Sequence, residues 1–345
     1  SFSGAFTIAI NNTGVAVNTS IDVAGTAVPL VLPAGPYLRI EGAGIDDDAD
    51  GVADRPTELN VFGQTLAGNF FIERLFQLDG TVLTRIAASD VTLELGPVVS
   101  GDDHVLELNN GEGQFLLTSE GIAGRLSGMV TVNAPGITVG TDFTVAINTT
   151  NALVMETFRV NGEDVLLAVE AGPYLRVEAA NTTVTIGGQS IGGDFAFERR
   201  ATTDGGEFIV LGVDNAFLSL GDPAAPLMTL SNGQGVFVLL DTGVAGRISV
   251  DAAVEIPGIS LSGSFELEVN KAMAAIDASI LVDGEVLTLV LDNLDFVRVA
   301  GRGVSLDVAG QVLSGDFLFE NATDSGGQSV VRIAASNVTL NLGDG

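Results

Sequence analysis

Apolar and polar residues alternate along many short segments of the chain. Residues 265–269 read Phe-Glu-Leu-Glu-Val, and residues 304–308 and 338–342 keep the same alternation. Successive side chains of a strand point to opposite faces, so a period of two predicts strands with one apolar and one polar face, as in antiparallel sheets. No segment combines a helical period of 3.6 residues with helix caps. The chain is therefore predicted to be all-β.

The predicted strands belong to segments that recur along the chain. Residues 3–11 return at 140–148 and again at 262–270, with Phe and Asn at matching places. Further recurring segments are 66–74, 191–199 and 313–320, and 85–93 with 332–340. Recurrence over such spans indicates a tandem array in which each unit packs on its neighbours.

We predict three β-repeat units, residues 1–139, 140–261 and 262–345, of which the third is incomplete. An acidic insertion at about 43–56 lengthens the first unit. The predicted architecture is a tandem β-repeat array, an elongated antiparallel meander or solenoid-like stack whose neighbouring units bury a continuous apolar seam.

The composition narrows the classes of partner. The chain has 44 acidic and 14 basic residues and a net charge of −30, which excludes nucleic acid because phosphate binding needs clustered Lys and Arg. It has no Cys, so disulfides and thiolate metal sites are excluded. No apolar run reaches 18 residues, so we expect no membrane insertion.

One acidic segment fits a calcium loop. Asp46, Asp48, Asp50, Gly51 and Asp54 follow the pattern D-x-D-x-D-G-x-x-D. Alternate carboxylates can converge on one hard cation, and Gly permits the sharp turn between them. Over these nine residues the segment resembles the calcium loops of thrombospondin type 3 and dockerin-like repeats. We predict calcium as a cofactor, with Asp46, Asp48, Asp50 and Asp54 as ligands; the alternative is a solvated acidic loop.

Most arginines occupy repeated positions. The four recurring sets are Arg39, Arg176 and Arg298; Arg125 and Arg247; Arg74 and Arg199; and Arg85 and Arg332. This arrangement predicts a ladder of arginine–carboxylate pairs between neighbouring strands, which offsets the self-repulsion of an acidic chain. The alternative is a site for an anion or a sugar acid.

The sequence offers no repeated catalytic group. His104 is the only His, and it follows Asp102 and Asp103 in a polar segment that we interpret as a surface turn. No nucleophile elbow accompanies it. We therefore expect no enzymatic activity and name no catalytic residue.

Several segments match the acceptor pattern for N-glycosylation. These sequons begin at Asn11, Asn18, Asn148, Asn181, Asn321 and Asn337. Glycans are expected there only in an extracellular archaeal or eukaryotic protein.

The Gly-, Val- and Asp-rich units, with recurring Ser-Gly-x-Phe and Gly-Asp-Phe-x-Phe-Glu, resemble the tandem-repeat regions of giant bacterial surface and adhesin-like proteins. The resemblance extends over the whole chain and is one of style. It implies an extracellular or cell-surface stalk or fibre built from repeated β-modules.

We predict a structural role in a surface filament, matrix fibre or adhesin stalk. The chain would be its own partner, because the segment from Val338 to Leu342 would accept Phe6 to Ile10 of the next copy by head-to-tail edge pairing. The alternative is a calcium-dependent module that binds carbohydrate or a surface. A polysaccharide-active enzyme ranks last, because most distinctive residues recur in every unit rather than in one.

Overall fold

The computed structural model describes residues 2–45, 57–61, 64–76, 80–100, 103–134, 137–160, 163–186, 189–201, 207–222, 224–323 and 328–343. Within these ranges every regular element is a β-strand, and the pairings are antiparallel. The predicted all-β class and antiparallel meander are confirmed.

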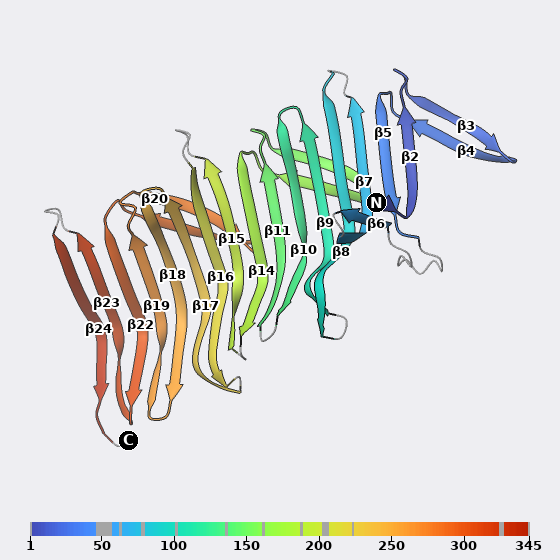
Figure 1. Cartoon of the computed structure of the whole chain (residues 1–345). Helices are drawn as coiled ribbons and strands as arrows, with labels where there is room; N and C mark the ends of the chain where they lie inside the picture. Colours follow the sequence, from blue (N-terminus) through green and yellow to red (C-terminus); the bar gives the residue numbers. More distant parts are fainter. Residues whose placement is uncertain are drawn as a thin grey trace. The chain divides into compact units, whose positions relative to one another are not determined.

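The strands follow one another closely along the chain (Figure 1). They are β1 (Phe2–Ser3), β2 (Ala5–Asn11), β3 (Val17–Val23), β4 (Thr26–Leu32), β5 (Tyr37–Ala43), β6 (Thr57–Val61), β7 (Gln64–Phe76), β8 (Val82–Ser100), β9 (Asp103–Thr118), β10 (Gly121–Ala134), β11 (Ile137–Asn148), β12 (Val154–Val160), β13 (Glu163–Val169), β14 (Tyr174–Ile186), β15 (Gln189–Ala201), β16 (Glu207–Asp222), β17 (Ala225–Leu240), β18 (Gly243–Ile256), β19 (Ile259–Asn270), β20 (Ile276–Val282), β21 (Glu285–Leu291), β22 (Phe296–Val308), β23 (Gln311–Thr323) and β24 (Ser329–Asn341).

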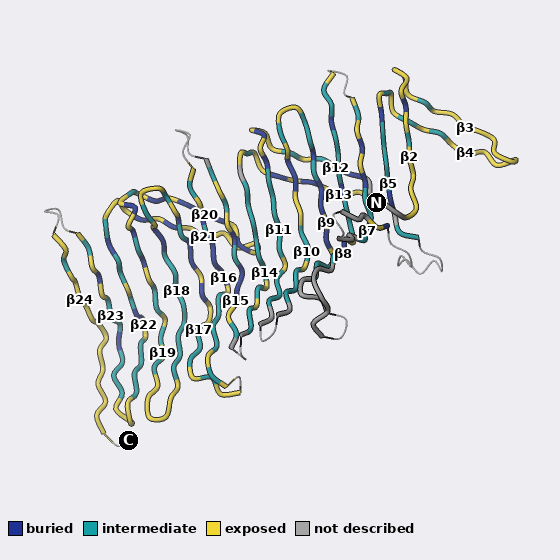
Figure 2. The backbone as a smooth tube through the Cα atoms, viewed as in Figure 1, coloured by how far each residue is buried: buried dark blue, intermediate teal, exposed yellow. Residues whose placement is uncertain are grey.

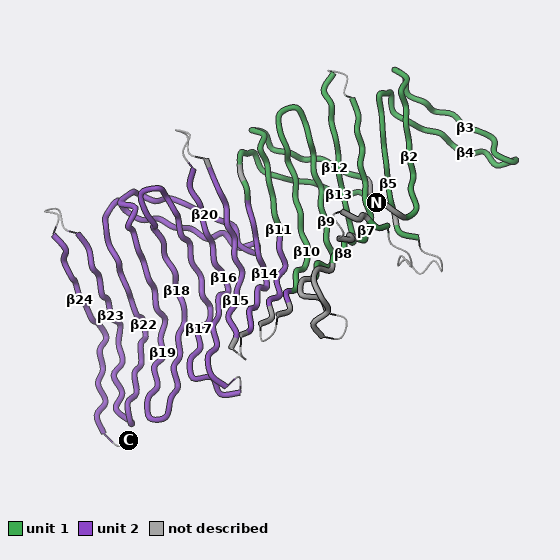
Figure 3. The backbone as a smooth tube through the Cα atoms, in the orientation of Figure 1, with its two compact units in different colours: residues 1–131, 144–175 green, residues 132–143, 176–345 purple. Residues whose placement is uncertain are grey.

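The chain divides into two compact units (Figure 3). The first contains residues 1–131 and 144–175, and the second contains residues 132–143 and 176–345. This division follows proximity in space, whereas the three predicted repeat units follow recurring sequence. The repeat boundaries therefore stay a prediction.

In the described part of the chain, three two-stranded hairpins leave the meander, and all three share one design. The pairs β3–β4, β12–β13 and β20–β21 each join seven-residue strands in a register that leaves two residues for the turn. In two of these turns, Ala24-Gly25 and Asp283-Gly284, φ is 53° and 89°, and 42° and 86°. Two consecutive positive φ angles are typical of a type I′ turn, whose twist matches that of the paired strands.

In the second unit, the β20–β21 hairpin covers one face of the meander (Figure 2). The buried cluster consists of Ala196, Val210, Val236, Val238 and Ala245 of the sheet, Ile276, Ala278, Ile280, Val282, Leu287, Leu289 and Leu291 of the hairpin, and Ala272 and Phe296 beside it. At Gly212 an added Cβ would lie 2.4 Å from a Val282 methyl carbon, so this position admits only Gly at the observed spacing. We call the covered side the hairpin face.

The β12–β13 hairpin covers the first unit in the same way. Phe158 and Leu167 of the hairpin are each 1% exposed, and they pack with Phe71 and Leu83 of the meander. Burial of these large apolar side chains stabilises the unit, because a sheet alone has no second layer to exclude water.

A buried Asn closes the base of every hairpin. The side-chain Nδ2 of Asn11 donates to the carbonyls of Val15 and Pro33 (2.8 and 2.5 Å), that of Asn148 to Ala152 and Glu170 (2.8 and 2.6 Å), and that of Asn270 to Ala274 and Asp292 (2.9 and 2.7 Å). Each amide therefore ties the segment that enters a hairpin to the segment that leaves it. These three Asn are the last residues of the recurring segments 3–11, 140–148 and 262–270.

Replacing Asn270 should loosen the β20–β21 hairpin. Asn270→Ala leaves two inward carbonyls without their donor, and we expect a loss of about 3 kcal/mol in unfolding free energy. The rate of amide hydrogen exchange should increase more in the hairpin than in the rest of the unit. Asn293→Ala, at an exposed position next to the acceptor Asp292, is the control. Equal exchange in the two variants would contradict the proposed role of the buried amide.

Candidate functional site

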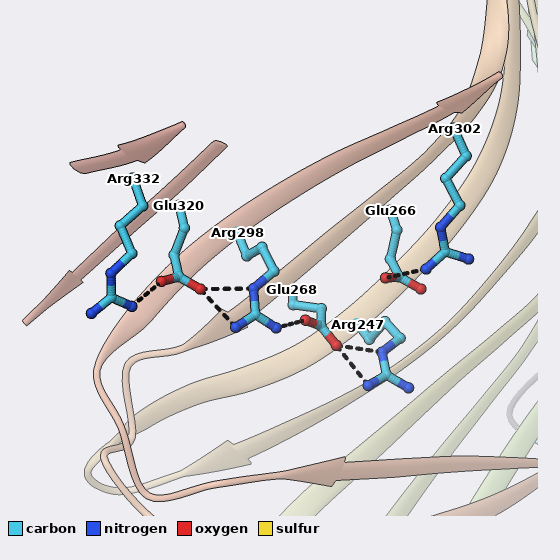
Figure 4. A network of polar contacts seen from close by, with 7 residues as sticks. All are labelled: Arg247, Glu266, Glu268, Arg298, Arg302, Glu320 and Arg332. Carbon is cyan, nitrogen blue, oxygen red and sulfur yellow. Dashed lines mark hydrogen bonds and ion pairs between the residues drawn. The ribbon is translucent and has the colours of Figure 1, made fainter. Parts of the chain in front are cut away.

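The most organised polar cluster of the second unit is a row of five charged side chains on the hairpin face (Figure 4). Arg247, Glu268, Arg298, Glu320 and Arg332 come from β18, β19, β22, β23 and β24, where the strand register places each directly opposite the next. Successive N···O distances are 2.6, 2.7, 2.6 and 2.5 Å. We call this row the arginine–glutamate ladder.

The glutamates of the ladder are its buried members. The side chains of Glu268 and Glu320 are 7% exposed, whereas those of Arg298 and Arg332 are 38% and 61% exposed. The hydrogen bond from Arg298 is the main cause that lowers the pKa of Glu320, and the same bond is the main cause that raises the pKa of Arg298. A carboxylate at this depth needs its cation, because an unpaired buried charge is strongly destabilising.

The first unit carries a shorter version of the same device. Arg85 donates to Glu73 at 2.8 Å, and the Tyr37 hydroxyl donates to the other carboxylate oxygen at 2.9 Å. Burial, followed by the bond to Glu73, raises the pKa of Tyr37 to about 12. Arg85 also contacts Glu156 of β12, so the sheet pairs with the hairpin that covers it.

Arginines also hold the β20–β21 hairpin in the second unit. Arg200 donates to the carbonyl of Ser279 at 2.8 Å, and Arg176 donates to the carbonyl of Leu281. Both carbonyls belong to β20. The guanidinium groups therefore supply donors to backbone acceptors of the hairpin, which a sheet edge otherwise leaves to water.

A second polar device recurs where strands bulge. A side-chain amide donates to a carboxylate on the adjacent strand in three repeated places: Asn69 to Asp90, Asn215 to Asp194, and Asn337 to Asp316, at 2.9, 2.9 and 2.6 Å. The bulge residues Asp90, Asn215 and Asn337 have φ of 53°, 50° and 54°, a conformation that Asn and Asp tolerate. The pairs therefore fix the bulges.

A groove of about 440 Å³ lies beside the ladder. Its walls are Arg247, Glu268, Val290, Leu291, Asp292, Leu294, Phe296, Arg298, Glu320, Ala322, Thr323 and Arg332. The arginines in the wall are paired with glutamates, so most of the positive charge is compensated where an anion would bind. The predicted arginine–carboxylate pairing between neighbouring strands is confirmed at Arg85, Arg176, Arg247, Arg298 and Arg332, while its alternative, an anion or sugar-acid site, stays untested.

The predicted calcium ligands Asp46, Asp48, Asp50 and Asp54 lie outside the described residues. Among the residues that are described, no group of three or more His, Cys, Asp or Glu is placed to hold a metal ion. The backbone of His104 belongs to β9 and pairs with Val98, rather than forming the predicted turn.

Four of the six sequon asparagines donate side-chain hydrogen bonds within the fold, and a fifth, Asn321, accepts one from Ser329 at 2.9 Å. Asn11 and Asn148 close hairpin bases, and Asn181 and Asn337 donate to Asp142 and Asp316 at 3.1 and 2.6 Å. A glycan on any of these amides would remove a hydrogen bond that the structure uses.

The arginines of the ladder were predicted from their repeated positions, but the glutamates that pair with them were not. A carboxylate close in sequence is also paired, since Arg39 contacts Glu41, two residues away on the same strand, at 2.7 Å. Three of the cross-strand partners of the repeated arginines, Glu73, Glu198 and Glu320, are each the last residue of the recurring Asp/Asn-Phe-x-x-Glu segment. Their recurrence at one position was the signal that could have identified them.

In comparisons with known proteins, no family model, no curated protein and no solved structure matched this chain. Within the described ranges no helix is long and apolar enough to cross a membrane.

Removing the central arginine should destabilise the second unit in a pH-dependent way. Arg298→Met removes the guanidinium group that pairs with both Glu268 and Glu320. We expect a loss of about 1–3 kcal/mol in unfolding free energy at pH 7. Because the folded pKa of Glu320 is lowered, its pairing stabilises above the unfolded pKa of about 4.3 and is lost as pH falls through the folded value.

Urea unfolding at pH 7 and pH 3 measures this effect, and the difference between wild type and Arg298→Met should shrink at pH 3. Arg302→Met is the matched control, since Arg302 is 73% exposed and lies 3.7 Å from Glu266. A deficit of the same size at both pH values would contradict the assignment to Glu320.

Proposed function

We propose that this chain is a structural repeat protein that associates head to tail in an extracellular or cell-surface filament, matrix fibre or adhesin stalk. The observation that supports this proposal is the use of hairpins within the chain. Each of β12–β13 and β20–β21 packs on meander strands that precede it in the sequence. A hairpin of this design therefore acts as the cover of an earlier repeat.

The β3–β4 hairpin has the form of such a cover, but none of the described strands lies as a sheet beneath its apolar side. Its inward positions match those of β20–β21, and Ile21, Val23 and Val28 are 52%, 57% and 46% exposed. The corresponding residues Ile280 and Val282 of β20 are 1% exposed. An amphipathic hairpin with its apolar side in water favours association with an apolar sheet.

The strands β23 and β24 have the form of a sheet that such a hairpin could cover. By register Leu318 and Ala334 occupy the places that Ala196 and Gly212 occupy under the β20–β21 hairpin. No described hairpin covers them, and β24 is exposed along nearly its whole length (Figure 2). An exposed strand of this kind offers backbone donors and acceptors to another chain.

In the proposed assembly, the segment Phe6 to Ile10 of one copy pairs with Val338 to Leu342 of another. The apolar side of the β3–β4 hairpin then lies over the last strands of that copy. Main-chain hydrogen bonds give the pairing its direction, and burial of the hairpin supplies most of the stabilisation. The same two contacts, edge pairing and hairpin cover, occur inside the chain.

A charge on the inner side of the hairpin should stop this assembly. For Ile21→Asp we expect at least about tenfold less sedimentable polymer, because a buried carboxylate without a partner costs more than 1.4 kcal/mol. Negative-stain electron microscopy should show short particles in place of fibres. Deletion of residues 1–11 should have the same effect.

Ser20→Asp is the matched control, since it adds the same charge one residue away on the outer side of β3. It should polymerise as wild type does. The proposal is wrong if Ile21→Asp and Ser20→Asp assemble equally, or if the wild-type chain forms no fibres at any concentration.

Calcium at Asp46 to Asp54 remains part of the proposal, and it rests on the sequence pattern alone. Isothermal titration should find one calcium site per chain that is absent from an Asp48→Asn/Asp50→Asn double variant. Fibres that dissociate in chelator would give this site a role in cohesion. A wild-type chain that takes up no calcium would leave the acidic-loop interpretation.

A further inference from the structure

The face of the second unit that points away from the β20–β21 hairpin is apolar along entire strands. On β18 every second residue from Val244 to Ile256 is apolar or Gly, and on β19 the same holds from Ile259 to Val269. These positions alternate with Ala245, Arg247 and Glu268, which belong to the hairpin face. We call this second side of β18, β19, β22, β23 and β24 the open face.

The strand register carries the apolar pattern from strand to strand. Leu261 of β19 pairs with Leu306, Leu306 with Leu313, and Leu313 with Leu340. A second row runs through Leu267, Val299, Phe319 and Ile333. Because pairing preserves the side of the sheet, these rows form one continuous surface rather than scattered apolar residues.

Charge is separated completely between the two sides of these five fully described strands. All of their charged side chains, among them Asp251, Glu266, Asp307 and the ladder, fall on the hairpin face or at its bulges. The open face contributes large exposed apolar groups instead: Phe319, Leu340 and Ile333 are 46%, 58% and 77% exposed. Such a patch on a soluble chain marks an interaction surface.

Aromatic rings fill the open face where Gly leaves space. The ring of Phe237 on β17 lies so close to Gly246 that an added Cβ would be 2.2 Å from it, and Phe265 approaches Gly301 in a similar way at 3.2 Å. Ring and Gly pairs on adjacent strands close the gaps in the layer. The resulting surface has no large gaps and resembles the inner face of one sheet in a β-sandwich.

The area of the open face and the net charge of the chain favour a second copy of this chain as the partner that covers the open face. Five strands about 4.8 Å apart, with 13 residues in β22 at about 3.3 Å each, present roughly 1,000 Å². A stable interface needs about 800 Å² from each partner. The acidic net charge of −30 disfavours an anionic membrane surface.

Two open faces that meet keep all the charges of these strands on the outer sides. Packed sheets lie about 10 Å apart, so the two outer sides are separated by more than the screening length of about 8 Å at physiological salt. Repulsion between the acidic hairpin faces is therefore weak, and no charge has to be buried.

We infer that two copies pack open face to open face, as the two layers of a sandwich related by a two-fold axis. This lateral pairing does not depend on head-to-tail association. It adds a second sheet to a single chain or to a filament, whereas head-to-tail contact adds length.

The test is the mass of the full chain by sedimentation equilibrium, in the Ile21→Asp background that blocks head-to-tail growth. We expect twice the chain mass of 35.3 kDa. Adding Leu261→Glu, which puts a carboxylate in the row of Leu261, Leu306, Leu313 and Leu340 on the open face, should give 35.3 kDa with an unchanged β-sheet circular dichroism spectrum. Adding Ser262→Glu instead, one residue away on the hairpin face, should leave the paired mass intact.

The second measurement is the rate of cysteine labelling, which does not require a charge on the open face. The chain has no Cys, so single-cysteine variants report on one position each. Leu306→Cys on the open face and Asp307→Cys on the hairpin face replace neighbours that are both half-buried in one chain. Pairing should slow the maleimide reaction at 306 by about tenfold relative to 307, and Leu261→Glu should abolish the difference.

Three outcomes would overturn the inference: a single-chain mass for Ile21→Asp, equal masses for the Leu261→Glu and Ser262→Glu variants, or equal reaction rates at 306 and 307. A single-chain mass together with flotation on neutral phosphatidylcholine vesicles would assign the open face to lipid. Failure of head-to-tail assembly is read separately, from the length of wild-type fibres.

Discussion

A β-sheet satisfies its backbone hydrogen bonds within one layer, but it buries side chains only against a second layer. This constraint governs each compact unit of the chain. The meander supplies strands paired on both sides, and the hairpins supply the missing layer over part of one face. The fully buried large residues, such as Phe71 and Phe158 in one unit and Ile280 and Leu289 in the other, lie where hairpin and sheet meet.

The polar devices serve the same contact between layers. The buried amide of Asn270 sets where the hairpin leaves the sheet, and the guanidinium groups of Arg176 and Arg200 bind its strand β20 from the sheet below. Apolar contacts are not directional, so the hydrogen bonds of these groups fix the orientation of the hairpin on the sheet. On the strands β18, β19 and β22 to β24, the charged groups belong to the hairpin face, which leaves the other face free for a purely apolar contact.

Much of the fold could be predicted from the sequence, because the period of two is a local property. The alternation at residues 265–269 lies within β19, and the type of pairing follows from one polar face. The hairpins could not be predicted, since β20 alternates just as the meander strands do and only three-dimensional packing decides which strands fold back. The partner of Arg298 was missed for a related reason: Glu320 is 22 residues away, and the register that joins them is not a local property.

The bulge pairs show what the repeats preserve. In the second and third copies of the recurring segment, Asp194 and Asp316 accept from Asn215 and Asn337; in the first copy the two residue types are exchanged, and Asn69 donates to Asp90. A carboxylate that transfers a proton or binds a metal could not change places with its amide partner, because only one of the two can ionise. A hydrogen bond that fixes a bulge is unaffected by the exchange. What recurs is thus the contact rather than the chemical group, which is the behaviour expected of residues whose hydrogen bond fixes the bulge.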